Sequence, residues 1–387
     1  MNDHAITYIG KTNFRNSNQK FGIKDQDRLQ HLYVIGKSGT GKSTLLKQMA
    51  LSDIHRGNGL CVIDPHGDVA KELLQQIPES RKTDLIYFDA TSKNPLAFNP
   101  LYNIPQNYHH LVAAGLISTF KKIWADSWGP RLEYILRFSL LTLMHYPNAT
   151  LLDIQPLLTN HIFRNNILGY VVDGHIQAFW KDEFEKYFAT LKAEAIAPIL
   201  NKVGLFATSL PLRNIVGQQV SSFKMQQVLD NKKILIVNLS KGQIGEDASS
   251  LLGSMLISSI QLAALHRAAI AEDSRIPFYV YIDEAHSFLT QAFIGILSES
   301  RKFKLSLYIT HQYMEQMPNE IRSAIFGNVG TIISFRIGVD DAVILAKEFY
   351  PIFNEEDLVN LPRFAMYLKL MIDGSVSKPF SANTIFL

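Results

Sequence analysis

The run Gly-Lys-Ser-Gly-Thr-Gly-Lys-Ser at residues 36–43 constrains this chain more than any other feature. It matches the P-loop pattern G-x-x-x-x-G-K-[ST], and both flanks fit. The apolar stretch 32–35 predicts a strand, and residues 43–55 predict a helix that ends at the turn signal Gly57-Asn58-Gly59. Small residues let backbone N–H groups turn toward phosphates, and the helix N-terminus adds positive potential. The sequence therefore predicts a phosphate-binding loop in an α/β fold.

The side chains of this loop have separate expected roles. Lys42 is expected to reach the β- and γ-phosphates of a nucleotide, and Ser43 is expected to be a magnesium ligand. ATP and Mg²⁺ are therefore the predicted cofactors. The predicted nucleotide contacts are Gly36, Lys37, Ser38, Gly39, Thr40, Gly41, Lys42, Ser43 and Thr44.

A second apolar stretch, Phe-Tyr-Val-Tyr-Ile at residues 278–282, is followed by Asp283 and Glu284. A strand that ends in this way is the Walker B pattern, in which Asp283 would hold the magnesium ion and Glu284 would orient and polarise the attacking water. A strand that simply ends in an acidic turn is the alternative. Beside a P-loop, a glutamate directly after the aspartate favours ATP hydrolysis over a GTPase switch.

Three further residues are candidates for contact with the nucleotide. Gln312 follows the apolar stretch 306–310, and it would face the γ-phosphate if that strand lies beside the first one. Arg301 is a candidate arginine finger for the ATP of a neighbouring subunit, and Arg336 is a second candidate. The alternatives are an ordinary glutamine after a strand and solvated surface cations.

The loop Asp64-Pro65-His66-Gly67-Asp68 also follows an apolar stretch. Its proline and glycine predict a sharp turn at the same edge of the sheet as the P-loop. The spacing of its histidine and aspartates fits no standard set of metal ligands, so a metal site is not expected here. A loop near the nucleotide or near a translocated substrate is the preferred interpretation.

Short apolar stretches alternate with helical patterns along the chain, which is typical of a parallel α/β sheet. We predict a RecA-like core formed by residues 1–102 and 230–387, with a mostly helical insertion at 103–229 that contains helical spacing at 132–143 and 179–188. The predicted strands are His31–Ile35, Leu60–Asp64, Asp84–Phe88, Lys233–Leu239, Phe278–Asp283, Ser306–Thr310, Thr331–Phe335 and Met366–Met371.

Composition fits a globular chain, with 47% apolar and 19% charged residues and a formal net charge of +3. The single cysteine, Cys61, excludes a disulfide framework and is expected to be a small buried residue. No signal peptide is found, and the longest apolar stretch, 251–265, is interrupted by serine and glutamine. We therefore expect no membrane span and a cytoplasmic location, with recruitment to the inner membrane by partners left open.

These motifs together resemble the FtsK–HerA superfamily of P-loop DNA translocases. Within it, the chain is most similar to the conjugative coupling ATPases of the TraD, TraG and TrwB type and to HerA-type proteins. The Asp64–Asp68 loop and the stretch from Arg301 to Gln312 are the more diagnostic parts. Further similar stretches are Trp128-Gly129-Pro130-Arg131, Leu239-Ser240-Lys241-Gly242 with Gly245-Glu246, Gly327-Asn328-Val329-Gly330 and Lys378-Pro379-Phe380-Ser381.

The resemblance implies a hexameric ring that binds ATP between subunits and threads DNA through its pore. It also implies that Lys42, Ser43, Asp283, Glu284 and Gln312 act in one subunit, and that Arg301 acts on the next. Relaxosome, secretion-channel and nuclease proteins are the partners that it suggests. The chain differs from membrane-bound coupling proteins in that no N-terminal membrane anchor is found.

Two other functions stay open at this point. The chain could move or remodel protein, as the assembly ATPases of type IV secretion do, or it could form a nucleotide-gated ring that activates a partner nuclease. Basic and aromatic residues alternate in the insertion, at Lys121-Lys122-Ile123-Trp124, Phe163-Arg164 and Phe179-Trp180-Lys181. This pattern suits binding of single-stranded DNA, but it also suits an ordinary helical domain with aromatic core residues.

Overall fold

The computed structural model describes residues 6–385 of the chain, which form two compact units. The first contains residues up to 88, 226–239 and 263 onward, and it carries the large sheet. The second contains residues 89–225 and 240–262 and is helical. The insertion predicted at 103–229 differs from the second unit, which begins at residue 89 and also includes residues 240–262. The predicted division into domains therefore stays a prediction.

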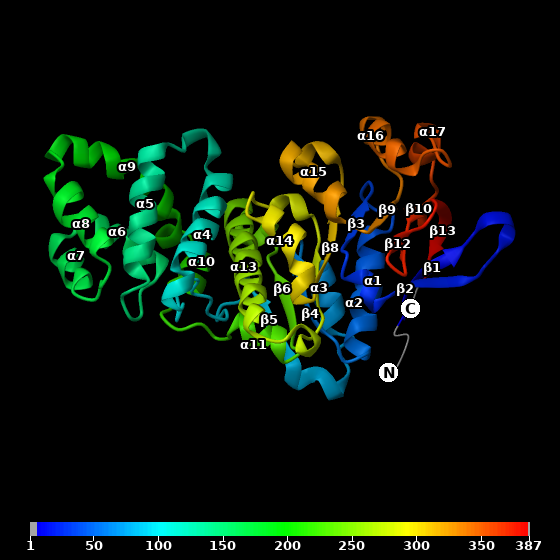
Figure 1. Ribbon diagram of the computed structural model, residues 1–387, viewed down its shortest axis with the longest axis horizontal. Coiled ribbons are helices and arrows are strands. Elements are labelled where there is room, and N and C mark those ends of the chain that lie inside the picture. The colour runs from blue at the N-terminus through cyan, green and yellow to red at the C-terminus, as the bar shows by residue number, and fades with distance from the viewer. Residues whose placement is uncertain (1–5, 386–387) are drawn as a thin grey trace. The chain divides into compact units, whose positions relative to one another are not determined.

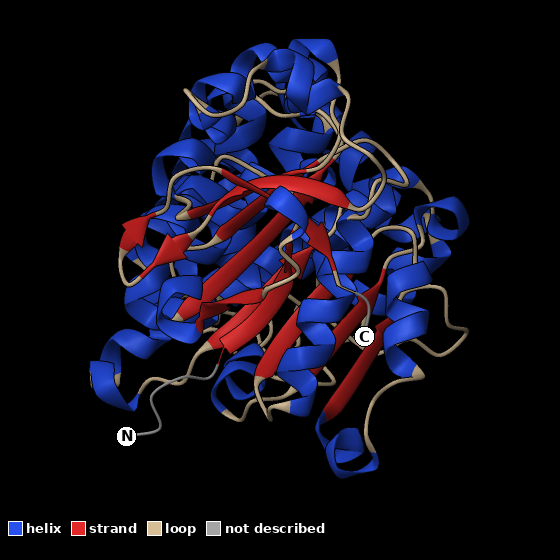
Figure 2. Cartoon of the chain, turned by 90° about the vertical axis from the view of Figure 1, so that its right-hand side faces the viewer, coloured by secondary structure: helices blue, strands red, loops and turns tan. Residues whose placement is uncertain are grey.

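The sheet of the first unit is mostly parallel and has helices on its faces (Figure 2). Its central strands lie in the order β9-β3-β8-β7-β4-β6, each parallel to its neighbours, and β5 follows β6. This is the predicted α/β fold, and all the predicted strands are present. Their bounds are β3 Leu32–Ile35, β4 Gly59–Asp64, β5 Leu85–Asp89, β6 Ile234–Asn238, β7 Phe278–Ile282, β8 Leu305–His311 and β9 Thr331–Ser334.

An antiparallel extension continues the sheet beyond β9, in the order β10-β13-β1-β2. Only β10 (Ala365–Lys369) was predicted. The strands β1 (Ile6–Thr12), β2 (Lys20–Lys24) and β13 (Phe380–Thr384) were missed. β2 lies at the edge of the sheet, and all three strands are partly exposed and have polar residues along them, so they lack the continuous apolar run that marks a strand buried on both faces.

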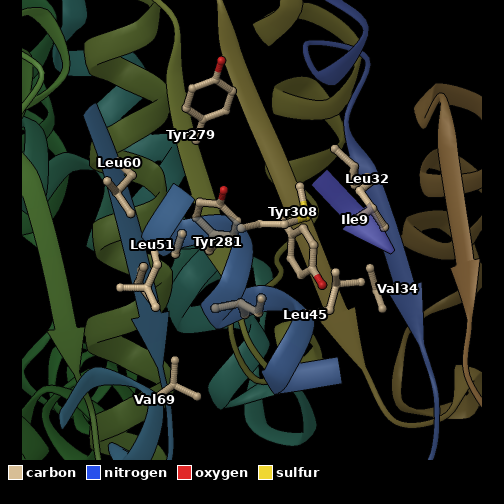
Figure 3. Close-up of a cluster of buried hydrophobic side chains, with 14 of the residues drawn as sticks. Ile9, Leu32, Val34, Leu45, Leu51, Leu60, Val69, Tyr279, Tyr281 and Tyr308 are labelled. Atoms are coloured by element: carbon tan, nitrogen blue, oxygen red, sulfur yellow. The ribbon is translucent and has the colours of Figure 1, made fainter. Parts of the chain in front are cut away.

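Helix α2 (Lys42–His55) packs on the centre of this sheet and closes the hydrophobic core. Leu45 and Leu51 of α2 point toward Tyr281 and Tyr308 of the sheet, as Figure 3 shows. Because α2 follows the P-loop directly, burial of this face fixes the loop. The other elements of the first unit are α1 Asp25–Arg28, α3 Asp68–Leu74, α11 Met225–Asp230, α14 Phe293–Glu299, α15 Asn319–Asn328, α16 Val339–Phe349, α17 Glu355–Val359, β11 Met371–Ile372 and β12 Ser375–Val376.

The core also encloses an ion pair between Arg28 and Asp53. Both side chains are almost fully buried, and the two guanidinium nitrogens donate to the two carboxylate oxygens at 2.7 Å each. The hydroxyl of Tyr281 accepts a further bond from Arg28 at 2.7 Å, and the ring of Tyr279 lies 3.8 Å from the guanidinium carbon. Asp53 belongs to α2 and Arg28 to α1, so the pair joins these two helices, and its bonds with Tyr281 connect it to β7 of the sheet.

The second unit is built of helices (Figure 1), and some of its aromatic residues lie in its core. Phe179 and Trp180 are buried, and the Trp180 indole N–H donates to Thr142 Oγ1 at 2.7 Å. These two rings are therefore core residues and unavailable for stacking on DNA bases. The helices are α4 His109–Ile123, α5 Pro130–Leu143, α6 Ile154–Thr159, α7 His161–Leu168, α8 Gly174–Ala178, α9 Ala189–Thr208, α10 Leu210–Val216, α12 Lys241–Ile244 and α13 Glu246–His266.

Two helical segments differ in detail from what the sequence predicts. Residues 179–188, predicted as helical spacing, form a π-helical turn at Phe179–Glu183 and a 3-10 turn at Phe184–Lys186, in which Phe179, Trp180 and Phe184 are buried, whereas Phe188 is exposed. In addition, residues Glu246–Ala269 have the length and mean hydropathy of a membrane span, although none was expected. Of its most apolar 18-residue window, 72% is buried within the protein, as in the core helix of a folded domain.

We predict that Asp53→Asn lowers the free energy of unfolding by about 3–5 kcal/mol, because it leaves the Arg28 charge buried and unpaired. Urea denaturation followed by circular dichroism measures the loss. The matched control is Glu348→Gln, which removes the half-exposed pair with Lys369 and should cost less than about 1 kcal/mol. Equal losses in the two variants would contradict the structural role of the buried pair.

Candidate functional site

The P-loop joins β3 to α2 and takes a shape that depends on glycine. Gly39 and Gly41 have φ angles of +74° and +130°, which side chains other than glycine rarely adopt. A Cβ at Gly36 would lie 2.6 Å from Cβ of Phe335, which follows β9. The glycines of the motif are therefore required by the local backbone and by close packing against the next strand.

Lys42 lies within this loop and is almost fully buried. Its Nζ donates to the carbonyl oxygen of Gly36 at 2.6 Å and to that of Lys37 at 3.2 Å. Burial lowers the pKa of Lys42, and the negative charges of Glu284 and Asp283 partly oppose that shift. The ammonium group is thus held at the centre of the loop, where the predicted phosphate contacts converge.

Asp283 lies just beyond β7 and comes together with Ser43, as predicted for two residues at one metal site. Oγ of Ser43 lies 3.4 Å from Oδ2 of Asp283, and Oγ1 of Thr310 donates to Oδ1 at 2.6 Å. Thr310 was not singled out from the sequence. It lies on β8, between β3, which leads into the P-loop, and β7, which precedes Asp283, and it fixes the orientation of the carboxylate.

Glu284 and Gln312 are also brought together. Nε2 of Gln312 donates to Oε1 of Glu284 at 2.8 Å. The other carboxylate oxygen, Oε2, is buried without a hydrogen-bond donor among the described residues, and it lies 3.5 Å from Nδ1 of His286. Glu284 has a φ of 45°, a strained value for a residue with a side chain, of the kind found at functional sites.

Burial raises the pKa of Glu284, and the negative charge of Asp283 adds to the shift. The hydrogen bond from Gln312 and the positive charges of Lys42 and His66 act in the opposite direction. A carboxylate with a raised pKa, a buried free oxygen and a fixed partner suits a group that polarises water.

Asp64, the first residue of the predicted Asp64–Asp68 loop, is the last residue of β4 and is fully buried. Its carboxylate accepts hydrogen bonds from the backbone N–H groups of His66 at 2.8 Å and Ala70 at 2.9 Å. The side chain therefore shapes the turn and caps α3. The loop lies at the end of the strands where Glu284 is found, since β4 and β7 are neighbouring parallel strands with Ile63 opposite Ile282.

The two candidate arginines lie at opposite ends of the parallel strands, since Arg301 precedes β8 and Arg336 follows β9. Arg301 is exposed and precedes β8, near His31 at the start of β3, where it helps burial to lower the histidine pKa to about 4. The length of β8, about 3.3 Å per residue, separates Arg301 from Gln312. Arg301 therefore cannot reach the P-loop of its own chain. Arg336 is exposed beside that loop, and its carbonyl oxygen accepts from the N–H of Lys37 at 2.8 Å.

Two more groups that contact the site were missed. His311 is buried, its Nε2 bonds the hydroxyl of Tyr33, and its Nδ1 lies 3.1 Å from the Tyr313 carbonyl oxygen, so it fixes the chain on both sides of Gln312. Arg363 donates through Nε to the carbonyl oxygen of Gly39 at 3.0 Å. Neither residue belongs to a short motif, so only the folded chain reveals them.

The residues present fit a magnesium–nucleotide complex. A glycine-rich loop at a helix N-terminus and a buried lysine suit phosphates, and the Ser43 hydroxyl beside the Asp283 carboxylate offers the oxygen ligands that Mg²⁺ prefers. Among residues 6–385, no group of three or more histidine, cysteine or acidic side chains could hold a metal ion.

Comparison with known proteins agrees with the resemblance to coupling proteins. No family model matches the chain. A curated relative, the type 4 coupling protein DotL of Legionella pneumophila, is 20% identical, and the match covers 80% of this chain and 46% of DotL. The chain thus spans about half the length of this relative.

Solved structures show the same fold. The unbound conjugative coupling protein TrwBdeltaN70 has a TM-score of 0.70 at 12% identity, over 99% of this chain and 90% of that chain. VirB4 of Thermoanaerobacter pseudethanolicus has a TM-score of 0.68 at 14% identity, over 100% and 98%. TrwB has also been solved with ADP and Mg²⁺, at a TM-score of 0.69 and 14% identity, over 94% and 87%. The fold of this chain is that of these P-loop proteins.

We predict that Glu284→Gln raises the free energy of unfolding by about 1 kcal/mol at pH 8, because active-site residues are often held at a cost in stability. The folded-state pKa of Glu284 is raised, so above that pKa the buried side chain is ionised and its charge opposes folding. At low pH the side chain is protonated in the folded and the unfolded protein, and this cost is absent. The gain should therefore disappear as the pH falls toward 4. Denaturation curves at both pH values test this, and a gain that does not depend on pH would contradict it.

Proposed function

We propose that this chain is an ATPase that hydrolyses Mg-ATP at the subunit interfaces of a ring and uses the energy to move DNA through the pore. The observation that carries the proposal is the joint placement of Ser43 with Asp283 and of Gln312 with Glu284 around a buried P-loop lysine. That arrangement lies on a fold shared with conjugative coupling proteins over nearly the whole chain.

Each residue has a role that follows from its position. Bound Mg²⁺ would neutralise phosphate charge and orient the phosphates. Ser43 and Asp283 would hold the ion, and Thr310 would keep Asp283 turned toward it. Lys42 would leave the carbonyl oxygens of the loop for phosphate oxygens. Glu284 would accept the proton of a water molecule that Gln312 helps to position, since the two side chains are already paired.

The position of Arg301 supports an oligomer in which it serves the site of the neighbouring subunit. It lies at the edge of the sheet opposite to the P-loop of its own chain, so a role in hydrolysis requires a second copy. A ring of six subunits, as the resemblance to the FtsK–HerA superfamily implies, would place Arg301 of each subunit at the P-loop of the next. Relaxosome, secretion-channel or nuclease proteins would direct its activity.

The first test compares ATPase rates without nucleic acid, with single-stranded DNA and with double-stranded DNA, at low and moderate salt. We expect one form of DNA to stimulate hydrolysis severalfold, and the stimulation to weaken with salt, because phosphate contacts release counterions. Lys42→Ala should abolish the activity. Lys47→Ala is the matched control, since Lys47 lies on the same helix and pairs with Glu72 instead.

Hydrolysis that responds to neither form of DNA would contradict the DNA motor and favour a motor that acts on protein. Absence of hydrolysis in the intact chain, with nucleotide still bound, would favour a nucleotide-gated ring that activates a partner.

A second test concerns Arg301. We expect Arg301→Ala to lower kcat by about 10³-fold or more, the usual effect of losing an arginine finger. Mixing Arg301→Ala with Lys42→Ala subunits should restore part of the activity, because an intact P-loop can then meet an intact Arg301 from its neighbour. Arg336→Ala, mixed in the same way with Lys42→Ala, serves as the control. Failure of the mixture to recover activity would contradict a role in a neighbouring site.

A further inference from the structure

His286 lies two residues after Glu284, and its imidazole ring is close to the carboxylate of that residue. Nδ1 of His286 is 3.5 Å from Oε2 of Glu284, and the His286 side chain is 20% exposed. The other carboxylate oxygen, Oε1, already accepts from Nε2 of Gln312 at 2.8 Å. Oε2 is buried and accepts no hydrogen bond from the described residues. His286 thus lies beside the oxygen of Glu284 that has no donor.

The other nitrogen of the imidazole ring contacts Gln316, which belongs to the 3-10 turn Met314–Gln316 after β8. Nε2 of Gln316 is 3.3 Å from Nε2 of His286. The amide oxygen of Gln316 accepts from the backbone N–H of Tyr313 at 3.2 Å. Because that bond fixes the amide oxygen, the amide nitrogen is the atom beside His286, and an amide nitrogen can only donate.

The orientation of the Gln316 amide determines where His286 carries its proton. Nε2 of His286 accepts from Gln316, so the neutral ring has its proton on Nδ1. Nδ1 is the nitrogen beside Glu284. The hydroxyl of Ser287, 3.4 Å from Nε2, can donate to the same nitrogen as Gln316 and does not compete for Nδ1. His286 is therefore held in the tautomer that can donate to Glu284.

These contacts form a closed ring, because Tyr313 directly follows Gln312 in the chain. One line of donors runs from Tyr313 through Gln316 to His286. It ends at one carboxylate oxygen of Glu284, and Gln312 donates to the other. The last step, at 3.5 Å, is longer than a hydrogen bond, and catalytic contacts of this length commonly shorten when substrate binds. A carboxylate oxygen has two lone pairs, so Oε2 can accept from His286 and from a water molecule together.

We propose that His286 is a positioning residue for ATP hydrolysis, held by Gln316 in the tautomer that donates to Glu284, an assignment that rests on the proposed ATPase function. Its N–H fixes the second oxygen of the carboxylate, so that Glu284 stays directed at the attacking water. Because the ring includes the backbone of Tyr313, the orientation of Glu284 is tied to that of Gln312.

The test measures kcat and KM for ATP hydrolysis by three variants of His286 in the full chain. His286→Leu removes both nitrogens and keeps an apolar side chain of moderate size. We expect its kcat to fall about 10- to 100-fold, as when a residue that orients a ligand or catalytic group is lost, with KM within about twofold of the wild type. His286→Asn places an amide near the position of Nδ1 and should restore most of the rate. His286→Gln carries its amide farther out, toward Gln316, and should not.

Gln316 gives an independent test of the ring. Gln316→Leu should lower kcat by a similar factor, and the double variant with His286→Leu should be no slower than His286→Leu alone, because both changes break one line of donors. Gln291→Ala is the matched control, since it removes an exposed amide from the segment before α14, and it should leave kcat unchanged.

Equal kcat values for the wild type and His286→Leu would overturn the assignment. Equal losses in His286→Leu and His286→Asn would also overturn it, since a loss that an amide does not repair is one of packing. If His286→Leu does not bind Mg-ATP in isothermal titration calorimetry, the two amide variants decide, and equal rates for His286→Asn and His286→Gln would overturn the assignment. Failure of the proposed function looks different, because the wild type itself would then not hydrolyse ATP.

Discussion

The parallel pairing of β3 with β8 on one side and β9 on the other is the interaction on which the rest of this structure depends. It aligns Ile35 with His311 and with Ser334, so that three strands end at one edge. The loops that follow them then carry the P-loop, Gln312 and Arg336 to that edge. Because carboxyl ends of parallel strands share an edge, residues nearly 300 positions apart in the chain become neighbours.

The candidate site contains buried charged groups and a strained backbone, whereas the core is mostly apolar. Glu284 is buried with a raised pKa and a left-handed backbone, and Lys42 is buried with a lowered pKa. Each of these features opposes folding, since the two buried charges are taken out of water and the backbone of Glu284 is strained. The apolar contact between α2 and the sheet, together with the Arg28–Asp53 pair, offsets that cost and holds the P-loop in place.

The sequence was informative where one physical requirement dominates a segment. Strands buried on both faces must be continuously apolar, so β3, β4, β7 and β8 were predicted close to their bounds. Strands of the antiparallel extension such as β1 and β13 are only partly buried, so they have no such requirement and were missed. The positions of Phe179 and Trp180 could not be predicted either, because alternation of basic and aromatic residues does not show whether a ring faces the core or the solvent. Both rings are buried.

The sequence by itself determined the α/β class, the phosphate loop and the acidic and amide residues around it, because their chemistry requires particular residue types at fixed local spacing. Only the tertiary structure decided which of these side chains meet. It paired Gln312 with Glu284 and added Thr310 and Arg363. It also placed Arg301 out of reach of its own loop. Strand order sets these distances, and strand order follows from long-range packing that local spacing does not encode.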